Sequence, residues 1–498
     1  MKTKGYKHQI ETVEWSNDKK HFAYLHEMGC GKSWCLLAHV ERGFNRFDFD
    51  TLLLIAPKGI YRNWVDKEIP THMSIPYDIY LYRSSMTDIQ FKKMVKELDR
   101  PTKKLRIVIM NVEALGVSKL AKKFSMDTVK KFQCLIAIDE STTIKTPTSN
   151  RTDACLTLSE IGESHRVIMT GSPITKGPYD LYSQANFLNP NYLGFSSFLA
   201  YRNYYSEILT HRIGLVEQED GTKRMQHQYI KGAAAWTPGT RQQYEKVLEY
   251  KNLDQLHEKI KPWSFRVLKK DCLDLPPKVY MTRDVELTKE QAKAYNEMST
   301  EWITQYDAGL ITATIALTRL MKLHQILCGH VKNDDGEVII IPSHRISVLT
   351  QLLDEVSAKT IIWANYRQDV VNICTTLPLE QTVQYHGGVN DMDRKEAVER
   401  FQNDPNCMWF VGTTRTAGRG ITLTAASNMI FYSYDYDREL RIQAEDRAHR
   451  IGQEEKLTIT DIRAPGTIDD VILAAHKYKG MIADQIIEEA KVTLTSRL

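Results

Sequence analysis

The stretch at residues 26–33, His-Glu-Met-Gly-Cys-Gly-Lys-Ser, constrains the fold of this chain more than any other. It follows an apolar run at 22–25 and precedes a run at 34–40 that has helical character. A strand, a glycine-rich turn and a helix start form an anion-binding geometry, because backbone N–H groups and the positive end of the helix dipole converge on one phosphate. The sequence therefore predicts a phosphate-binding loop at this position.

Each position of the loop has an expected role. Lys32 is placed to reach the β- and γ-phosphates, and the Ser33 hydroxyl is placed to bind Mg²⁺. His26 stands where the general pattern has glycine, so the loop alone is a partial match. Cys30 is interpreted as a small apolar filler rather than a redox sensor. The residues whose backbone is expected to surround the phosphates are Gly29, Cys30 and Gly31.

Two series of apolar runs predict an α/β fold with two lobes, one at 1–190 and one at 276–498. In each series short apolar runs alternate with helical patterns. This alternation is typical of a parallel sheet covered on both faces, in which the loops after the strands carry the site. The runs that predict strands lie at 22–25, 51–56, 106–110, 134–138, 166–169, 279–287, 360–364, 382–385, 408–412, 428–432 and 457–462.

Residues 191–275 have a different character and predict a helical insertion after the first lobe. They are rich in Tyr, Lys and Glu, and helices are expected near 196–208 and 239–261. Asp220-Gly221 lies between two strand-like runs and predicts a hairpin turn. Further helical material is expected at 288–355, within the second lobe.

Two adjacent carboxylates, Asp139 and Glu140, directly follow the apolar run at 134–138. A buried strand that ends in this pair can hold Mg²⁺ through Asp139 and place Glu140 to orient or deprotonate the attacking water. A solvated Asp-Glu pair is the alternative. Because the pair follows the phosphate loop in the same predicted lobe, we interpret both features as one site.

Near the other end of the chain, Arg447 and Arg450 lie within the segment 443–453, Gln-Ala-Glu-Asp-Arg-Ala-His-Arg-Ile-Gly-Gln. Their i, i+3 spacing on a helix would point both guanidinium groups from one face. A phosphoryl-transfer site needs a cation for the negative charge of the transition state, and arginine suits that role. We expect both to act from the second lobe on ATP bound to the first; a solvated basic helix is the alternative.

The composition of the chain limits the kinds of partner that it can bind. The 498-residue chain carries a formal charge of +4, which permits a nucleic-acid partner only through a local groove. Its eight cysteines include no C-x-x-C pair, as expected for reduced thiols. The longest apolar runs are strand-sized, so no membrane contact is expected. His324, Cys328 and His330 lack a fourth ligand at suitable spacing, so no metal cluster is predicted there.

These motifs occur in the order found in Swi/Snf-type ATPases, the double-stranded-DNA translocases of helicase superfamily two, and the chain resembles this family over almost its whole length. The family does not require the early glycine that His26 replaces. The matching segments are Gly5-Tyr-Lys-His-Gln9, residues 26–33, Ala56-Pro57-Lys58 with Trp64, Ile138-Asp-Glu140, Met169-Thr-Gly-Ser-Pro173, Leu275-Pro-Pro-Lys278, Tyr385-His-Gly-Gly388, residues 418–426 and residues 443–453.

The resemblance implies two RecA-like lobes that bind ATP and Mg²⁺. It implies an adenine contact for Gln9 and a place in the ATP site for Gln443. It also implies DNA contacts, which we expect at Lys58, Trp64, Thr414 and Arg415. Three positions depart from the family pattern: Ser141-Thr142 in the motif of Asp139, Tyr436-Asp-Arg438 where the family usually has W-N-P, and Asn111 at a usual tyrosine.

The function expected from this resemblance is an ATP-driven motor that moves along double-stranded or branched DNA and remodels forks, branches or bound proteins. Two alternatives stay open: a strand-separating DNA or RNA helicase, and an ATP-gated DNA clamp with slow turnover. We expect a monomer with a possible recruiting protein. The expected location is the cytoplasm of a bacterial or bacteriophage-infected cell, or the nucleus if the source is eukaryotic.

Overall fold

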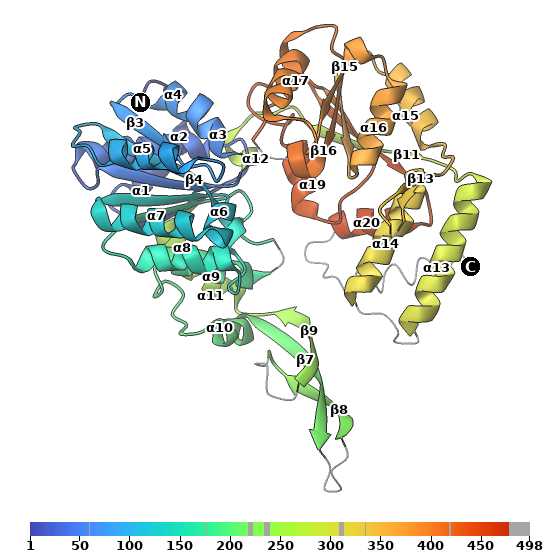
Figure 1. The fold of residues 1–498 in the computed structure, drawn as a ribbon, viewed down its shortest axis with the longest axis horizontal. Coiled ribbons are helices and arrows are strands. Elements are labelled where there is room, and N and C mark those ends of the chain that lie inside the picture. Colours follow the sequence, from blue (N-terminus) through green and yellow to red (C-terminus); the bar gives the residue numbers. More distant parts are fainter. Residues whose placement is uncertain are drawn as a thin grey trace. The chain divides into compact units, whose positions relative to one another are not determined.

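The computed structural model describes residues 1–477 apart from 59, 176, 218–222, 234–239, 308–312, 334 and 418–419. The chain divides into two compact units, Met1–Cys272 and Leu273–Leu498 (Figure 1). Each unit is built on its own parallel β-sheet with helices on both faces. This confirms the predicted α/β fold with two RecA-like lobes.

The first unit contains a seven-stranded sheet in which every neighbouring pair is parallel. The five strands predicted for this lobe are all present, and β3 and β10 are additional. In sheet order the strands are β10 (Ser264–Val267), β1 (His21–His26), β6 (His165–Met169), β5 (Cys134–Asp139), β2 (Thr51–Ala56), β4 (Leu105–Asn111) and β3 (Tyr77–Leu81).

Alternate residues of these strands enter two separate cores, one on each face of the sheet. Leu53 and Ile55 of β2 face one core, and Leu52 and Leu54 face the other. A strand buried on both faces must be apolar throughout, which is why these runs were visible in the sequence. One face is covered by α1 (Lys7–Ser16), α2 (Lys32–Asn45), α3 (Tyr61–Asn63) and α4 (Ile69–His72); the other by α5 (Asp88–Leu98), α6 (Val112–Val117), α7 (Lys119–Lys131), α8 (Asn150–Glu160) and α9 (Leu181–Leu188).

Strand β10 joins the first sheet from beyond the predicted end of the first lobe at residue 190. It pairs in parallel with β1, with Ala23 opposite Ser264 and His26 opposite Val267. The first unit therefore takes an edge strand from the segment predicted to be an insertion. A four-residue strand, Ser-Phe-Arg-Val, carries too short an apolar run to be recognised by its pattern.

The segment between α9 and β10 is mixed rather than helical throughout. The predicted helix near 196–208 is confirmed as α10 (Phe198–Tyr205), but the first half of the helix predicted at 239–261 is wrong, because those residues form strand β9 (Thr240–Tyr250). Strand β7 (Ser206–Glu217) pairs antiparallel with both β9 and β8 (Lys223–Lys231) (Figure 1). The β7–β8 pairing is the predicted hairpin; its turn at Asp220-Gly221 lies outside the described residues. Helices α11 (Leu253–Ile260) and α12 (Lys269–Cys272) complete the unit.

The second unit contains a six-stranded parallel sheet, and all six strands predicted for it are present. The helices expected at 288–355 are also confirmed. In sheet order the strands are β11 (Lys278–Asp284), β18 (Leu457–Arg463), β17 (Asn428–Phe431), β14 (Thr360–Ala364), β16 (Trp409–Thr413) and β15 (Thr382–Tyr385). A small antiparallel pair, β12 (His330–Lys332) and β13 (Val338–Ile340), accompanies α13 (Lys289–Asp307), α14 (Ala313–Leu327), α15 (Arg345–Asp354), α16 (Arg367–Thr376), α17 (Asp391–Asn403), α18 (Thr414–Ala417), α19 (Arg438–Glu445) and α20 (Ile468–Lys477).

A buried ion pair ties the second sheet to its helices. Arg345, the first residue of α15, pairs with Asp469 of α20, and both side chains are 0% exposed. Its guanidinium also donates to the carbonyls of Tyr432 (2.6 Å) and Ile462 (3.2 Å) at the ends of β17 and β18. One side chain therefore connects two strands with two helices.

The histidines of the discounted cluster lie beside polar side chains of the protein. His324 Nδ1 lies 2.9 Å from the Tyr366 hydroxyl, and His330 Nδ1 lies 3.3 Å from the Asp369 carboxylate. Burial lowers the pKa of His330 to about 4, so its ring is neutral near pH 7. Across the described part of the chain, no helix has the length and apolar character needed to cross a bilayer.

We predict that Arg345→Met lowers the free energy of unfolding of the second unit by about 3 kcal/mol, because it leaves the Asp469 carboxylate buried without its partner. Arg463→Met is the matched control, since Arg463 pairs with Asp284 and Asp470 at a partly exposed surface and should cost less than about 1 kcal/mol. Urea unfolding of the full chain measures both values. Equal losses in the two variants would contradict the proposed importance of the buried pair.

Candidate nucleotide site

The predicted phosphate loop connects β1 to α2. Gly29 and Gly31 have φ angles of 85° and 78°, in the left-handed region that favours glycine. Gly31 is the N-cap of α2, which begins at Lys32. A Cβ atom at Gly31 would lie 1.8 Å from the Gln9 side-chain nitrogen, so a larger residue would displace Gln9 from the loop as well as strain the backbone. The loop thus presents a helix N-terminus to an anion, as expected.

His26, which stands where the general pattern has glycine, contacts Lys32 through its backbone and packs its side chain inside the protein. The Lys32 ammonium donates to the His26 carbonyl (2.9 Å), which orients the lysine across the loop. The His26 side chain is buried beneath the loop, near the rings of His8, Tyr24 and Phe265. Burial and the nearby Lys32 charge lower the pKa of His26 to about 3. The neutral imidazole therefore acts as a packed spacer below the phosphate site.

Gln9 contacts the phosphate loop from α1. Its side-chain nitrogen donates to the Cys30 carbonyl (3.4 Å), and its side-chain oxygen accepts from the Tyr6 backbone N–H (2.9 Å). His8 Nε2 donates to the same Cys30 carbonyl (3.0 Å). The glutamine is therefore held directly beside the loop, where its contacts couple the N-terminal helix to the conformation of residues 29–31.

The acidic pair lies at the end of β5. The Asp139 carboxylate is buried and accepts from Trp64 Nε1 (2.9 Å) and from the Glu140 backbone N–H (3.0 Å). Burial and the neighbouring Glu140 charge raise the pKa of Asp139 to about 7. Glu140 has a φ of 51°, and its Oε2 atom is buried without a hydrogen-bond partner among the described residues. Two adjacent buried carboxylates, one of which has an oxygen without a partner among the described residues, fit a site that takes up a cation.

The phosphate loop and the acidic pair meet at one edge of the sheet. Strands β1 and β5 lie on either side of β6, so the loops after all three strands emerge together. After β6, a Cβ at Gly171 would contact the Met28 backbone nitrogen (3.3 Å) and the His26 carbonyl (3.4 Å). The structure therefore brings together Gln9, Gly29, Cys30, Gly31, Lys32, Ser33, Asp139 and Glu140 within the first unit.

Ser141 links the acidic pair to the loop after β6. Its hydroxyl donates to the Gln184 side-chain oxygen (2.7 Å), and the Gln184 amide donates to the carbonyls of Pro173 (2.9 Å) and Asp180 (2.7 Å). The departure from the family pattern at Ser141 thus has a direct hydrogen-bonding role. Gln184 was not predicted, because nothing in its local sequence distinguishes it from other polar residues on a helix.

Trp64, where a DNA contact is expected, has a buried side chain. The indole is 1% exposed, and its Nε1–H donates to the Asp139 carboxylate. Trp64 therefore positions a carboxylate of the nucleotide site. Lys58 is exposed, and its backbone N–H donates to the Glu113 carboxylate (3.1 Å).

In the second unit, the helix predicted to carry both arginines ends before them. Helix α19 finishes at Glu445, so Arg447 and Arg450 do not share a helical face. Arg447 is 7% exposed and donates to the carbonyls of Gln443 (2.9 Å) and Ile421 (3.2 Å), whereas Arg450 is half-buried. The two arginines are therefore not equivalent: Arg447 organises its own loop, and Arg450 is the more accessible.

The remaining second-unit predictions have defined surroundings. The Gln443 side chain is buried and donates to Glu439 (3.1 Å). Arg415 is exposed and pairs with Asp435 (2.6 Å), while the neighbouring Thr414 is buried. Gly418 and Arg419, at the start of the motif 418–426, lie outside the described residues.

Two departures from the family pattern are helix caps. The Asn111 side chain accepts from the Ala114 backbone N–H (2.6 Å) at the start of α6, and Asp437 accepts from the Glu439 N–H (2.9 Å) at the start of α19. Asn and Asp are favoured at this position because their short side chains satisfy an otherwise unpaired N–H group. Local helix capping therefore accounts for both residues.

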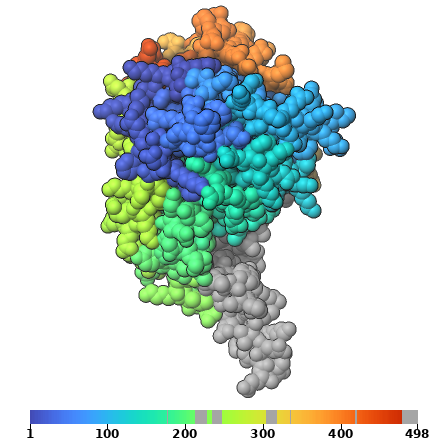
Figure 2. Space-filling model, turned by 90° about the vertical axis from the view of Figure 1, so that its left-hand side faces the viewer, coloured from blue at the N-terminus to red at the C-terminus, as the bar shows by residue number. Residues whose placement is uncertain are grey.

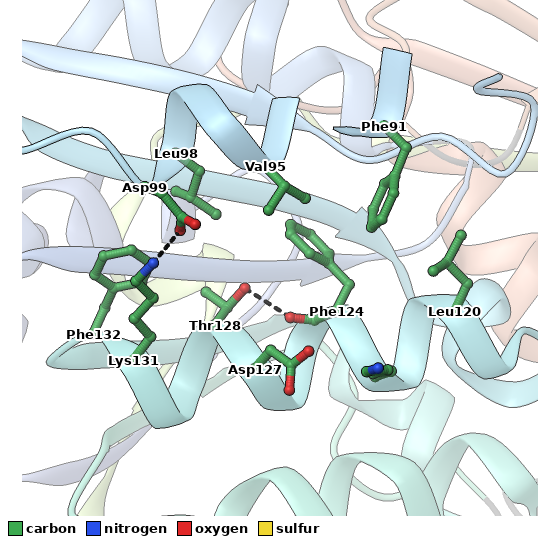
Figure 3. A pocket seen from close by; sticks show the side chains of 11 residues that line it. Phe91, Val95, Leu98, Asp99, Leu120, Phe124, Asp127, Thr128, Lys131 and Phe132 are labelled. Atoms are coloured by element: carbon green, nitrogen blue, oxygen red, sulfur yellow. Dashed lines mark hydrogen bonds and ion pairs between the residues drawn. The ribbon is translucent and has the colours of Figure 1, made fainter. Parts of the chain in front are cut away.

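A separate groove of about 410 Å³ lies between α5 and α7 (Figure 3). Lys131 and Asp99 form an ion pair (2.6 Å) at its rim. Helix α5 falls in the light-blue part and α7 in the cyan part of the sequence colouring in Figure 2. None of the predicted site residues lines the groove, so it is distinct from the nucleotide site. It is lined by Phe91, Val95, Leu98, Asp99, Leu120, Lys123, Phe124, Asp127, Thr128, Lys131 and Phe132.

A phosphate loop and an acidic pair at one edge of a parallel sheet define a nucleoside-triphosphate-binding protein. Comparison with protein-family models identifies the family. A model described as "SNF2-related domain" matches residues 8–333, and one described as "Helicase conserved C-terminal domain" matches residues 344–452. The chain belongs to the SNF2-related family, and it is a helicase-like ATP hydrolase of that family.

Curated relatives are about a quarter identical to this chain over the segments that align. "TATA-binding protein-associated factor MOT1" of Saccharomyces cerevisiae is 24% identical over 72% of the chain and 21% of the relative. "DNA annealing helicase and endonuclease ZRANB3" is 26% identical in Mus musculus, over 72% of the chain and 30% of the relative. The human ZRANB3 protein is 25% identical over 88% and 36%. The chain thus spans between a fifth and about a third of these relatives.

Among solved structures, this chain is similar to the "Sulfolobus solfataricus SWI2/SNF2 ATPase core in complex with dsDNA". It is 20% identical and covers 100% of this chain and 96% of that chain, with a TM-score of 0.40.

We predict that Trp64→Phe lowers DNA-independent ATP hydrolysis about tenfold, because the ring still fills its site while Asp139 loses a donor worth about 1.4 kcal/mol. DNA affinity should not change. Trp15→Phe, at a half-exposed position on α1, is the matched control. If Trp64→Phe weakened DNA binding and left DNA-independent hydrolysis intact, a DNA-contact role would replace the positioning role.

Proposed function

We propose that this protein is an ATP-driven motor that moves along double-stranded DNA and remodels forks, branches or bound proteins. The observation that carries the proposal is the joint placement of the phosphate loop and the Asp139–Glu140 pair at one sheet edge, in a chain of the SNF2-related family. The alternatives are a strand-separating DNA or RNA helicase and an ATP-gated clamp with slow turnover.

Within the first unit, each residue has a distinct proposed task. The loop N–H groups and Lys32 bind the phosphates, and Gln9 contacts the adenine. Ser33 and Asp139 would hold Mg²⁺, which supplies charge neutralisation on the phosphate oxygens. Glu140 Oε2, which has no hydrogen-bond partner in the part of the chain that the structure describes, accepts the proton of the attacking water. Trp64 and Ser141 keep the two carboxylates in place.

Residues of the second unit complete the proposed reaction. Arg450 supplies positive charge to the transition state, and Arg447 shapes the loop that presents it. Gln443 is proposed to belong to the same ATP site. A motor of this kind needs ATP turnover to depend on residues of both units, because that dependence couples hydrolysis to their relative motion.

The proposal of DNA as partner rests on the family and on the relatives, two of which have names that describe a DNA annealing helicase and endonuclease. We propose that DNA is tracked through its phosphates, with little sequence preference. Exposed Lys58 and Arg415 are the candidate contacts among the residues predicted for this role. A monomeric motor, positioned by a recruiting protein, is the proposed working form.

We predict that double-stranded or forked DNA stimulates ATP hydrolysis at least about tenfold more than RNA does, and that the motor displaces a triplex-forming strand from duplex DNA. Steady-state ATPase assays with duplex, forked and single-stranded DNA and RNA measure the first outcome, and triplex displacement measures the second. Stimulation by RNA alone, or duplex unwinding as the main product, would favour the helicase alternative. A motor cannot displace the triplex-forming strand without hydrolysing ATP. Slow ATP hydrolysis with every nucleic acid would therefore favour the ATP-gated clamp.

We predict that Arg450→Ala reduces kcat by at least about 100-fold while the affinity for ATP changes less than about threefold, because the lost charge acts in the transition state. Glu140→Gln should give the same separation through loss of the base. Arg463→Ala, a partly exposed arginine of the same unit, is the control and should hydrolyse ATP normally. Loss of ATP binding in Arg450→Ala would show that its role is ground-state binding.

A further inference from the structure

The last segment of the first unit lies directly on the phosphate loop. The Glu27 backbone N–H donates to the Val267 carbonyl (2.9 Å), and the Glu27 carboxylate accepts from the Lys269 backbone N–H (2.8 Å). The third contact joins two sulfur atoms: Cys272 Sγ donates to Cys30 Sγ at 3.7 Å. Strand β10 and helix α12 therefore run beside the loop and end against its central residue.

The two cysteines differ in access. Cys30 is wholly buried within the loop, whereas Cys272 is partly exposed at the end of α12. The sequence alone favours a filler role for Cys30 over a redox role, and the contact with the Cys272 sulfur is what changes that interpretation. Burial raises the pKa of Cys30 to about 12 and also raises the pKa of Cys272. Cys272 is thus the thiol that an oxidant in solution can reach, and Cys30 is the thiol held beside it.

We propose that Cys30 and Cys272 form a reversible disulfide that closes the phosphate loop to nucleotide. With hydrogen peroxide as oxidant, the Cys272 thiolate attacks one peroxide oxygen, the O–O bond breaks, and a sulfenic acid and hydroxide form. The hydroxide takes up a proton to become water. The Cys30 sulfur then attacks the Cys272 sulfur, the S–O bond breaks, and a second water leaves. Two thiols are oxidised, and one peroxide is reduced to two waters.

The disulfide acts on nucleotide binding through the loop backbone. The Cys30 carbonyl already accepts from His8 and Gln9, and the Cys30 N–H donates to the Glu27 carbonyl (3.2 Å). A covalent link to Cys272 draws this central residue toward α12 and removes the freedom the loop needs to fit around a triphosphate. The expected loss of nucleotide binding rests on the proposed function, whereas formation of the disulfide does not depend on it.

The test treats the full-length protein with hydrogen peroxide and then identifies disulfide-linked peptides by mass spectrometry under non-reducing conditions. We expect a Cys30–Cys272 peptide whose yield rises with pH, because the thiolate fraction rises. Binding of a fluorescent ATP analogue should weaken at least about tenfold and recover with dithiothreitol. Cys272→Ser should bind nucleotide normally and should keep its affinity after peroxide.

Cys374→Ser is the matched control, because Cys374 is also partly exposed but lies in the second unit. This variant should be inactivated by peroxide like the unaltered protein. A different peptide pair, or no linked peptide while Cys272 accumulates as a sulfinic acid, would overturn the proposed bond. A Cys30–Cys272 bond with unchanged nucleotide affinity would overturn its effect on the loop. Failure of nucleotide binding in the untreated, reduced protein would instead refute the proposed function.

Discussion

A parallel sheet covered on both faces leaves one place where polar groups of neighbouring strands can meet a ligand, the edge at which the strands end. In the first unit β1, β6 and β5 are adjacent, so the phosphate loop, the loop at Gly171 and the acidic pair all emerge there. The Asp139 carboxylate is the most constrained group at this edge, because it is buried beside a second carboxylate and held by Trp64. The other site contacts depend on this arrangement of strand ends.

The strands that were predictable from sequence are those buried on both faces, because such strands must be apolar along their whole length. Strand β3 was missed since Tyr77–Leu81 is only partly buried, and β9 was mistaken for helix since its charged residues follow a helical spacing and only pairing with β7 decides its conformation. The positive φ angles of Gly29 and Gly31 agree with the glycine-rich turn expected there, because a short turn depends on the residues within it. The contacts of Trp64 with Asp139 and of Cys272 with Cys30 were not predicted, because they join residues that lie far apart in the chain.

The two units use buried polar groups differently. In the first unit the Glu140 carboxylate has one oxygen without a partner among the described residues, beside the buried Asp139 carboxylate at the end of β5, which suits a cationic ligand. In the second unit Arg345 pairs with Asp469 and donates to two strand carbonyls, so one side chain joins the ends of β17 and β18 to α15 and α20. Two atoms of this buried pair, Arg345 Nε and Asp469 Oδ1, have no hydrogen-bond partner among the described residues.

The position of β10 has a consequence for how the protein is made on the ribosome. Strand β1 is synthesised early but can pair with β10 only after the residues that follow β6 have been made. At about 5–20 residues per second, synthesis from Met169 to Ser264 takes roughly 5–20 s. During that time one edge of β1 keeps unpaired backbone groups, the kind of edge to which other chains can add. The newest part of the nascent first unit is therefore needed to protect one of its oldest strands.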